Sequence, residues 1–323
     1  MHKPITIMFK MNGTKCNIKC AYCYELLDEN KKKASKIKQK NRLSSKDVIE
    51  VLKDNSYRSY ISVLFHGGEP LLTPRKDFEE IIEFINVNYG YKCEIQIQTN
   101  ATLINKSWIE LFKKIKCKFV ISISLDPAGF KNLRGIGYPD YIEKVWCKIL
   151  LLQQSGIVVT IMSVAHKWNQ LSFNEFVQQL VSKGVRYLTI NKYESASFDN
   201  ENFISEKEYN SILMSVAEFW IKNELYREIE IQPLMSLFSN KKNRLCQYLS
   251  DNDKCGLFIT IYPDKKTSCD HLYSKSPVVD VNCKTCDIFS WCGGGCLSAI
   301  KDSSFCASRK NLKMFIEKIK NEN

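Results

Sequence analysis

Residues 16–23 read Cys-Asn-Ile-Lys-Cys-Ala-Tyr-Cys, so a short loop carries three cysteines, Cys16, Cys20 and Cys23. They follow an apolar, β-branched run, Ile5–Lys10, which predicts a buried strand. Three thiolates on one loop can bind three irons of a four-iron cluster and leave the fourth iron open to a small molecule. A zinc site is the alternative, but zinc needs a fourth ligand, and His2 is the only histidine before His66. The spacing favours an iron–sulfur loop directly after the first strand.

Strand and helix patterns alternate along the chain up to about residue 225. The strand candidates are rich in Ile, Val and Phe, as buried parallel strands are: Ile5–Lys10, Ile61–Phe65, Glu94–Gln98, Phe119–Leu125, Val158–Val164 and Val185–Asn191. The helix candidates are Ser45–Leu52, Asp77–Asn88, Lys106–Lys114, Tyr141–Gln154, Asn174–Lys183 and Ser205–Lys222. Because parallel strands need crossover connections, this order predicts an α/β fold, a partial (β/α)6 TIM barrel. Functional residues are then expected just after the carboxyl ends of the strands.

The pattern changes after residue 230, where periodicity is weak and cysteines are frequent. The densest part reads Cys283-x2-Cys286-x5-Cys292-x3-Cys296, with glycines at 293–295. Such a segment buries too little apolar surface to fold alone, and clustered cysteines in a cytosolic chain indicate metal binding. Two zinc sites are the alternative to iron–sulfur clusters. We expect residues 1–230 to form the barrel and residues 231–323 to form a metal-stabilised domain that ends in a helix over Asn311–Ile319.

The composition is that of an ordinary soluble protein: 323 residues, 44% hydrophobic and 25% charged. No apolar run approaches the ~20 residues of a membrane helix, and the N-terminus lacks a signal-peptide core, so we expect a cytoplasmic protein without a membrane partner. The net charge of +12, partly from lysines within residues 31–40, permits a polyanionic partner. A zinc-binding nucleic-acid module is thus a remote alternative, although the chain lacks interleaved aromatic and basic residues, which makes nucleic acid an unlikely partner.

Small and polar residues follow two predicted strands. Residues 66–70 read His-Gly-Gly-Glu-Pro, and paired glycines after a strand let the backbone approach a ligand closely. Ser122 and Ser124 end the fourth strand, where their hydroxyls bind a ligand or hydrogen-bond to nearby backbone. His66 is either a substrate contact or a strand-end histidine that is satisfied within the fold.

The cysteine loop, including Tyr22 before its third cysteine, resembles the signature of the radical S-adenosylmethionine (SAM) superfamily. In that family the open iron binds SAM, and an electron from the cluster cleaves SAM to methionine and a 5′-deoxyadenosyl radical, which abstracts hydrogen from the substrate. The resemblance implies that Cys16, Cys20 and Cys23 hold this [4Fe–4S] cluster. It also implies a set of cofactor-binding residues: Tyr22, Gly67, Gly68, Glu69 and Ser124.

The C-terminal array resembles the SPASM extension of radical SAM enzymes, which carries two auxiliary [4Fe–4S] clusters. The resemblance implies one auxiliary cluster on Cys283, Cys286, Cys292 and Cys306. It implies a second on Cys255, Cys269 and Cys296, with Cys246 as the fourth ligand. Asp264 stands where the family usually has glycine, and the segment from Cys269 to Cys283 is short, so the shape of the substrate cleft is expected to differ. The cysteines left over, Cys93, Cys117 and Cys147, are expected to be buried as small hydrophobic residues.

Among SPASM enzymes the chain is most similar to anaerobic sulfatase-maturating enzymes and related peptide maturases. Asp270, directly after Cys269, matches the aspartate proposed there as the general base; the alternative is a hydrogen-bond acceptor for its own loop. The resemblance implies an oxidoreductase that oxidises a residue of a ribosomally made peptide and yields a thioether, a carbon–carbon crosslink or an aldehyde. The alternative is a sulfatase maturase that converts Cys or Ser to formylglycine.

The implied partners are the peptide or protein substrate and a ferredoxin or flavodoxin as electron donor, in an anaerobic cell. Because Cys16 lies near the start of the sequence, we expect no leader-binding domain ahead of the barrel.

Overall fold

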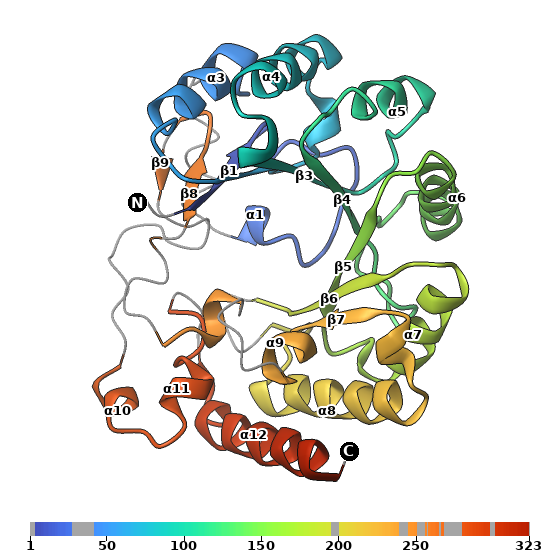
Figure 1. The fold of residues 1–323 in the computed structure, drawn as a ribbon. Coiled ribbons are helices and arrows are strands. Elements are labelled where there is room, and N and C mark those ends of the chain that lie inside the picture. Colours follow the sequence, from blue (N-terminus) through green and yellow to red (C-terminus); the bar gives the residue numbers. More distant parts are fainter. Residues whose placement is uncertain are drawn as a thin grey trace. The chain divides into compact units, whose positions relative to one another are not determined.

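The computed structural model describes residues 4–27, 42–194, 200–238, 245–250, 256, 258–264, 266–267, 280–297 and 301–322. The chain divides into two compact units, whose elements Figure 1 labels. The first unit contains residues 1–125, 134–160 and 256–270, and the second contains residues 126–133, 161–255 and 271–323. Each unit therefore combines segments that lie far apart in the sequence.

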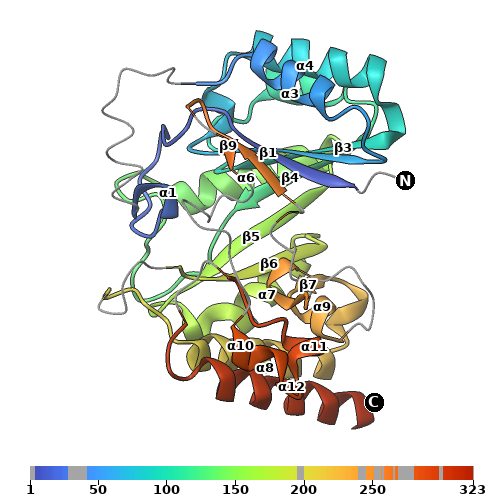
Figure 2. The same cartoon turned by 90° about the vertical axis from the view of Figure 1, so that its left-hand side faces the viewer.

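The first unit is built on parallel strands in the order β4-β3-β2-β1-β8, with β9 antiparallel at the edge. The strands are β1 (Ile5–Lys10), β2 (Ile61–His66), β3 (Cys93–Thr99), β4 (Lys118–Ser124), β8 (Phe258–Ile261) and β9 (Lys266–Thr267). The helices are α1 (Tyr24–Leu27), α3 (Ser45–Asp54), α4 (Arg75–Asn88), α5 (Lys106–Phe112) and α6 (Tyr141–Gln154). Both views show α3 and α4 on the same face of these strands (Figures 1 and 2).

The core of the first unit lies between β1–β4 and their helices. Alternate residues of β1, β2 and β3 are buried, so one face of these strands packs against the helices, whereas the last four residues of β4 are all buried. Phe9 of β1 stacks on Phe65 of β2 with ring centroids 5.9 Å apart, and Phe65 meets Phe78 of α4 edge-on at 5.0 Å. This packing fixes the carboxyl ends of β1 and β2, from which the cysteine loop and the glycine pair continue.

Strand β8 was not predicted, because its four residues are too few to show an alternation of hydrophobic and polar residues. It pairs in parallel with β1, from Thr6↔Phe258 to Phe9↔Ile261. Part of the segment that we expected to be held by metal is therefore held by backbone hydrogen bonds on the sheet of the first unit.

The second unit contains parallel strands in the order β7-β6-β5. The strands are β5 (Val159–Ala165), which begins in the first unit, β6 (Tyr187–Lys192) and β7 (Glu230–Gln232). The helices are α7 (Phe173–Ser182), α8 (Glu206–Lys222), α9 (Leu234–Phe238), α10 (Val281–Lys284), α11 (Phe289–Cys292) and α12 (Phe305–Glu322). In both views α8 and α12 lie side by side (Figures 1 and 2).

All predicted strands and helices are present, and most bounds agree within one or two residues. The C-terminal helix is longer than predicted, because α12 begins at Phe305 rather than Asn311. The division at residue 230 into two domains stays a prediction. None of the helices in the described ranges is both long and apolar enough to cross a membrane.

We predict that Thr260→Val raises the stability of the protein. Thr260 of β8 is 0% exposed, and its hydroxyl has no hydrogen-bond partner within the described residues, so the isosteric methyl group removes a desolvation penalty of about 1 kcal/mol. Thr99→Val is the matched control, because the buried Thr99 hydroxyl donates to Glu69 at 2.7 Å and its loss costs about 1–3 kcal/mol. Thermal unfolding measured side by side should show a higher midpoint for Thr260→Val and a lower one for Thr99→Val. A fall for both would contradict this account of Thr260.

Candidate functional site

The cysteine loop joins β1 to the short helix α1 and brings the thiols of Cys16, Cys20 and Cys23 together. Cys16 is exposed and the other two are partly buried, with the Cys23 amide donating to the Cys20 carbonyl at 3.1 Å. Burial, followed by the neighbouring Cys20 thiolate, raises the pKa of Cys23 to about 11. Burial also raises the pKa of Cys16, with a smaller contribution from Cys20. The thiols therefore interact electrostatically, and bound metal cations would relieve the repulsion between their thiolates.

The donor set of this loop suits an iron–sulfur cluster. Sulfur ligands on a short loop are the usual ligands of such clusters, and each iron takes its own thiolate, so the ligands stand further apart than around one zinc ion. In the part of the chain that the structure describes, no three Cys, His, Asp or Glu side chains lie at single-ion spacing.

The glycine pair after β2 packs directly against the start of the cysteine loop. Gly67 and Gly68 have φ angles of 83° and 55°, which side chains rarely adopt. A Cβ atom on Gly68 would lie 1.9 Å from the carbonyl oxygen of Lys15, and the Glu69 amide donates to that same oxygen at 2.9 Å. The backbone before Cys16 is thus held at a distance that only glycine permits.

Glu69 connects the loops that follow β2 and β3. It is 0% exposed, and its carboxylate accepts hydrogen bonds from the Leu71 amide at 2.9 Å, the Thr99 hydroxyl at 2.7 Å and the Asn100 amide at 2.8 Å. Burial raises the pKa of Glu69 to about 7, although these three hydrogen bonds act in the opposite direction. Its predicted contact with SAM stays a prediction; the hydrogen bonds give it a positioning role for both loops.

Asn100 extends this network to the cysteines, and sequence reasoning assigned it no role. Its side-chain nitrogen lies 3.6 Å from the Cys16 sulfur and 2.9 Å from the Asn17 side-chain oxygen. Asn17 in turn donates to the Thr102 hydroxyl at 2.8 Å. The available signal was the position of Asn100 directly after a buried strand, where polar residues face a site. An N–H group close to a sulfur can support thiolate character at Cys16.

Lys10 is a second residue that the sequence analysis missed. It is 0% exposed at the end of β1, and its ammonium group contacts the Tyr24 hydroxyl at 2.6 Å, the Glu25 carboxylate at 2.7 Å and His66 Nδ1 at 3.1 Å. The Gly67 amide also donates to His66 Nδ1 at 2.6 Å, so this nitrogen acts as an acceptor. His66 therefore fits the reading of a strand-end histidine that is satisfied within the fold. The available signal was a lysine as the last residue of a largely apolar strand.

Tyr22 and Arg134 close the other side of the cysteine loop. Both are largely buried, and the Arg134 guanidinium carbon lies 5.1 Å from the centre of the Tyr22 ring. Cys20 forms an isolated β-bridge with Arg134, and the Ile136 amide donates to the Lys19 carbonyl at 2.8 Å. Tyr22 thus anchors the loop; its predicted role in cofactor binding stays a prediction.

The two serines at the end of β4 differ in their surroundings. Ser122 is 0% exposed and its hydroxyl contacts Gln96 at 2.5 Å and Thr160 at 2.7 Å, so it is used within the sheet. The Ser124 hydroxyl has no hydrogen bond among the described residues, whereas its carbonyl accepts one from Tyr141 at 3.0 Å. Ser122 is therefore used within the sheet, and the predicted contact of Ser124 with SAM stays a prediction.

The second unit gathers most of the C-terminal cysteines. Burial raises the pKa of Cys283 of α10, and the nearby Cys292 of α11 and Cys306 of α12 raise it further. Burial also raises the pKa of Cys292, with a smaller contribution from Cys306. Cys286 packs against the small core of Ile288, Cys292 and Phe305. A Cβ atom on Gly294 would lie 3.5 Å from the Cys283 sulfur. These are the four cysteines predicted for one auxiliary cluster.

The predicted second auxiliary site is only partly visible. Cys246 begins a short 3₁₀ helix, Cys246–Tyr248, which lies against the glycine turn, since a Cβ on Gly293 would meet the Leu249 carbonyl at 2.5 Å. Cys296 follows that turn and is partly buried. Cys255, Cys269 and Asp270 lie outside the described residues. Of the cysteines with no predicted ligand role, Cys93 and Cys117 are buried as expected, but Cys147 is exposed on α6, so that prediction was wrong.

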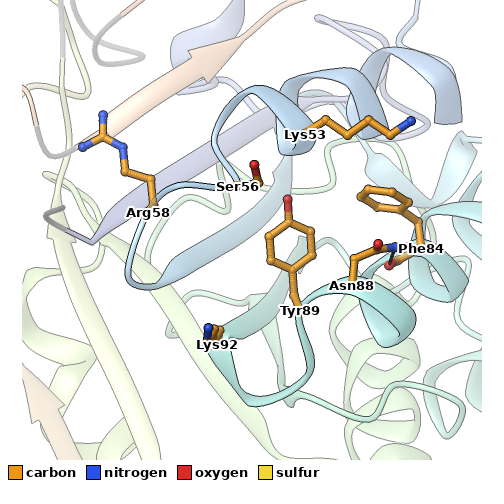
Figure 3. Close-up of a pocket in the computed structure, with 7 residues that line it drawn as sticks. All are labelled: Lys53, Ser56, Arg58, Phe84, Asn88, Tyr89 and Lys92. Carbon is orange, nitrogen blue, oxygen red and sulfur yellow. Dashed lines mark hydrogen bonds between the residues drawn. The ribbon is translucent and has the colours of Figure 1, made fainter. Parts of the chain in front are cut away.

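A pocket on the first unit lies away from these residues (Figure 3). Its lining residues come from the ends of α3 and α4 and the segments that enter β2 and β3, opposite to the strand ends that carry the cysteine loop: Lys53, Ser56, Arg58, Phe84, Asn88, Tyr89 and Lys92. Figure 3 shows the Lys53 and Arg58 side chains pointing away from each other. Its basic side chains therefore do not converge on one point.

We predict that Gly68→Ala prevents the first unit from loading its cluster. The added Cβ collides with the Lys15 carbonyl and displaces the backbone before Cys16, so iron after anaerobic reconstitution should fall by about four atoms per chain. Gly90→Ala is the matched control, because its φ of 52° is similar and a Cβ there meets nothing within 4 Å. Equal iron content in the two variants would contradict the role given to this contact.

Comparison with known proteins agrees with this geometry. The family model of the Radical SAM superfamily matches residues 13–180, more than half of the chain. The cysteine-type anaerobic sulfatase-maturating enzyme of Clostridium perfringens is 25% identical over 358 residues, which cover 95% of each chain. The structure of native anSMEcpe with bound AdoMet and Cp18Cys peptide superposes with a TM-score of 0.79 at 19% identity over 99% of each chain. The structure of SuiB of Streptococcus suis bound to precursor peptide SuiA superposes with a TM-score of 0.66 at 16% identity, over 94% of this chain and 76% of the SuiB chain.

These likenesses confirm the predicted fold class, an α/β partial barrel with a C-terminal SPASM domain. Together with the matched family model, they show that the chain belongs to the radical SAM superfamily.

Proposed function

We propose that the protein is a radical SAM oxidoreductase that modifies a residue of a ribosomally made peptide or a protein. The observation that carries this proposal is the likeness to the sulfatase-maturating enzyme of C. perfringens, which extends over 95% of both chains and so includes the C-terminal cysteines. Two similar structures hold peptides, Cp18Cys in one and SuiA in the other. A peptide substrate and a net oxidation are the reading that these likenesses support best.

The residues of the first unit have separate tasks in this proposal. A [4Fe–4S] cluster, when bound there, supplies the electron that cleaves SAM to methionine and a 5′-deoxyadenosyl radical, which takes a hydrogen atom from the substrate. Cys16, Cys20 and Cys23 hold the cluster. Gly67 and Gly68 let the turn after β2 pack against Lys10 and Lys15, and the backbone of this turn would bind SAM. The Ser124 hydroxyl, which has no hydrogen bond within the described residues, would bind the SAM carboxylate. Glu69 and Asn100 fix the loops that carry these groups.

The C-terminal cysteines complete the electron balance. A substrate that loses a hydrogen atom to the radical and a proton to a base still has one electron to release. Asp270 would take the proton, and auxiliary clusters held by the C-terminal cysteines would supply an acceptor for that electron. Cys283, Cys286, Cys292 and Cys306 hold one cluster, while Cys246, Cys255, Cys269 and Cys296 hold the other. A ferredoxin or flavodoxin is the proposed source of the first electron.

A second candidate is sulfatase maturation, the conversion of Cys or Ser to formylglycine. The full-length likeness to the C. perfringens enzyme favours it. Both candidates use the same cluster loop, so they differ in the substrate that the enzyme accepts and in the product that it forms.

We predict that Cys20→Ala abolishes formation of 5′-deoxyadenosine from SAM under reducing anaerobic conditions, because one of the three irons loses its thiolate. Cys147→Ala is the control, since Cys147 is an exposed cysteine of α6 outside both proposed ligand sets. It should retain the yield of the unaltered enzyme. Undiminished 5′-deoxyadenosine in the Cys20 variant would refute the mechanism.

Mass spectrometry separates the two candidate functions. The enzyme is incubated with SAM, reductant and a peptide of the Cys-x-Pro-x-Arg type, and in parallel it is co-expressed with any short peptide encoded beside its gene. Peptide modification predicts a mass change on the neighbouring peptide and none on the sulfatase-type peptide. A mass loss at the cysteine of the sulfatase-type peptide would instead establish the second candidate.

A further inference from the structure

Arg309 of α12 is the most deeply buried arginine that the structure describes, with a side-chain exposure of 2%. Its Nε donates to the Glu206 carboxylate at 2.5 Å, and Glu206 is itself buried at the first turn of α8. The guanidinium carbon lies 4.5 Å from the centre of the Tyr248 ring and 5.1 Å from that of Phe305. An ion pair on one edge and two aromatic rings thus fix the orientation of the guanidinium group.

One nitrogen of this fixed group has no acceptor. Nη1 of Arg309 is buried and makes no hydrogen bond within the described residues, and the neighbouring Tyr248 hydroxyl is buried and unpartnered as well. A buried charged donor without an acceptor is costly, and native structures rarely keep one. The Tyr248 hydroxyl can accept one hydrogen bond from Nη1, but Nη1 carries two N–H donors and the hydroxyl one O–H donor, so a further acceptor is needed at this place.

The cysteines of the first auxiliary set lie next to the same group. Arg309 and Cys292 are close enough for each charge to affect the pKa of the other side chain. Phe305, which stacks on Arg309, packs in one small core with Cys292. The glycine turn fits closely around this ring, because a Cβ on Gly295 would lie 2.5 Å from Phe305.

Lys301 is a second cation near these cysteines, 5.5 Å from the centre of the Phe305 ring, whereas the carboxylates described beside Arg309 are paired. Glu206 also binds Lys192 at 3.2 Å, and Lys192 lies 3.7 Å from Asp302. Asp302 accepts a hydrogen bond from the Glu206 amide at 2.7 Å, which ties the start of α12 to α8. These carboxylates are engaged by Lys192, by backbone and by Arg309 Nε, so the acceptors left near Nη1 among the described groups are the Tyr248 hydroxyl and the sulfur of Cys292.

We propose that Arg309 donates a hydrogen bond from Nη1 to a sulfur of the auxiliary cluster held by Cys283, Cys286, Cys292 and Cys306, and thereby keeps the reduction potential of that cluster more positive. The inference rests on the proposed function, which supplies the cluster. A reduced cluster carries one more negative charge than an oxidised one, so a fixed cation and donor beside it stabilises the reduced form. Arg309 would then be a positioning residue for the step in which the auxiliary cluster accepts an electron.

The test is a redox titration followed by electron paramagnetic resonance, in a chain in which Cys16, Cys20 and Cys23 are replaced by alanine so that only auxiliary clusters contribute. Arg309→Met should lower the equilibrium constant for cluster reduction at least tenfold, which for one electron is a fall of 59 mV. Lys313→Met is the matched control: it removes the same charge from α12, where Lys313 pairs only with Glu317 among the described residues, and it should leave the potential unchanged.

Iron content separates this inference from the proposed function. A chain without iron in this background would refute the auxiliary clusters and the inference with them. Full iron with an equal potential in Arg309→Met and Lys313→Met would overturn only the inference. If Arg309→Met fails to assemble its clusters, Arg309→Lys replaces it in the titration. Lysine keeps a cation for Glu206 but lacks the planar guanidinium group, so the reduction potential of the cluster should still fall. An unchanged reduction potential in Arg309→Lys would overturn the inference. If Tyr248→Phe lowers the reduction potential of the cluster as much as Arg309→Met does, the hydrogen bond to the cluster belongs to the tyrosine hydroxyl and not to Arg309.

Discussion

The contact between the Gly68–Glu69 backbone and the Lys15 carbonyl is the constraint on which the site depends. It brings the end of β2 against the residue that precedes Cys16, at a distance that excludes any side chain at position 68. The buried carboxylate of Glu69 then holds the loop after β3, whose Asn100 reaches the Cys16 sulfur. Three consecutive strand ends are thereby connected to one cysteine loop, and the rigid core beneath them, built on Phe9 and Phe65, prevents them from moving apart.

The two units share structural features around their cysteines. In each unit, glycines with positive φ allow close backbone packing near sulfur, Gly67 and Gly68 in the first and the 293–295 turn in the second. Each unit also buries a cation that is paired with a carboxylate: Lys10 with Glu25 of the helix that follows Cys23, and Arg309 with Glu206 near Cys292. The carboxylates limit the cost of burying the positive charge.

The sequence predicted the strands and helices that have a clear pattern of hydrophobic residues, and it missed those that form only through tertiary contacts. Strand β1 was predicted at its observed bounds because its apolar run is uninterrupted, whereas β8 is too short to show alternation and is a strand only because β1 offers an edge. The ligand candidates Cys16, Cys20 and Cys23 follow from spacing along the chain. Asn100 could not be found in this way, because it lies 84 residues from Cys16 in sequence, and Lys10 could not, because its partners Glu25 and His66 lie 15 and 56 residues away on other elements. Cys147 was expected to be buried from its helix pattern, but it lies on the exposed face of α6.

The most direct test of the central claim is whether SAM binds to an iron that the loop leaves open. The reduced, reconstituted protein is examined by electron–nuclear double resonance with SAM that carries nitrogen-15 on its amino group. The account predicts a hyperfine coupling between that nitrogen and the cluster, and its loss when Cys16, Cys20 and Cys23 are replaced. A fully loaded protein that shows no coupling to the labelled nitrogen would contradict the assignment of this loop.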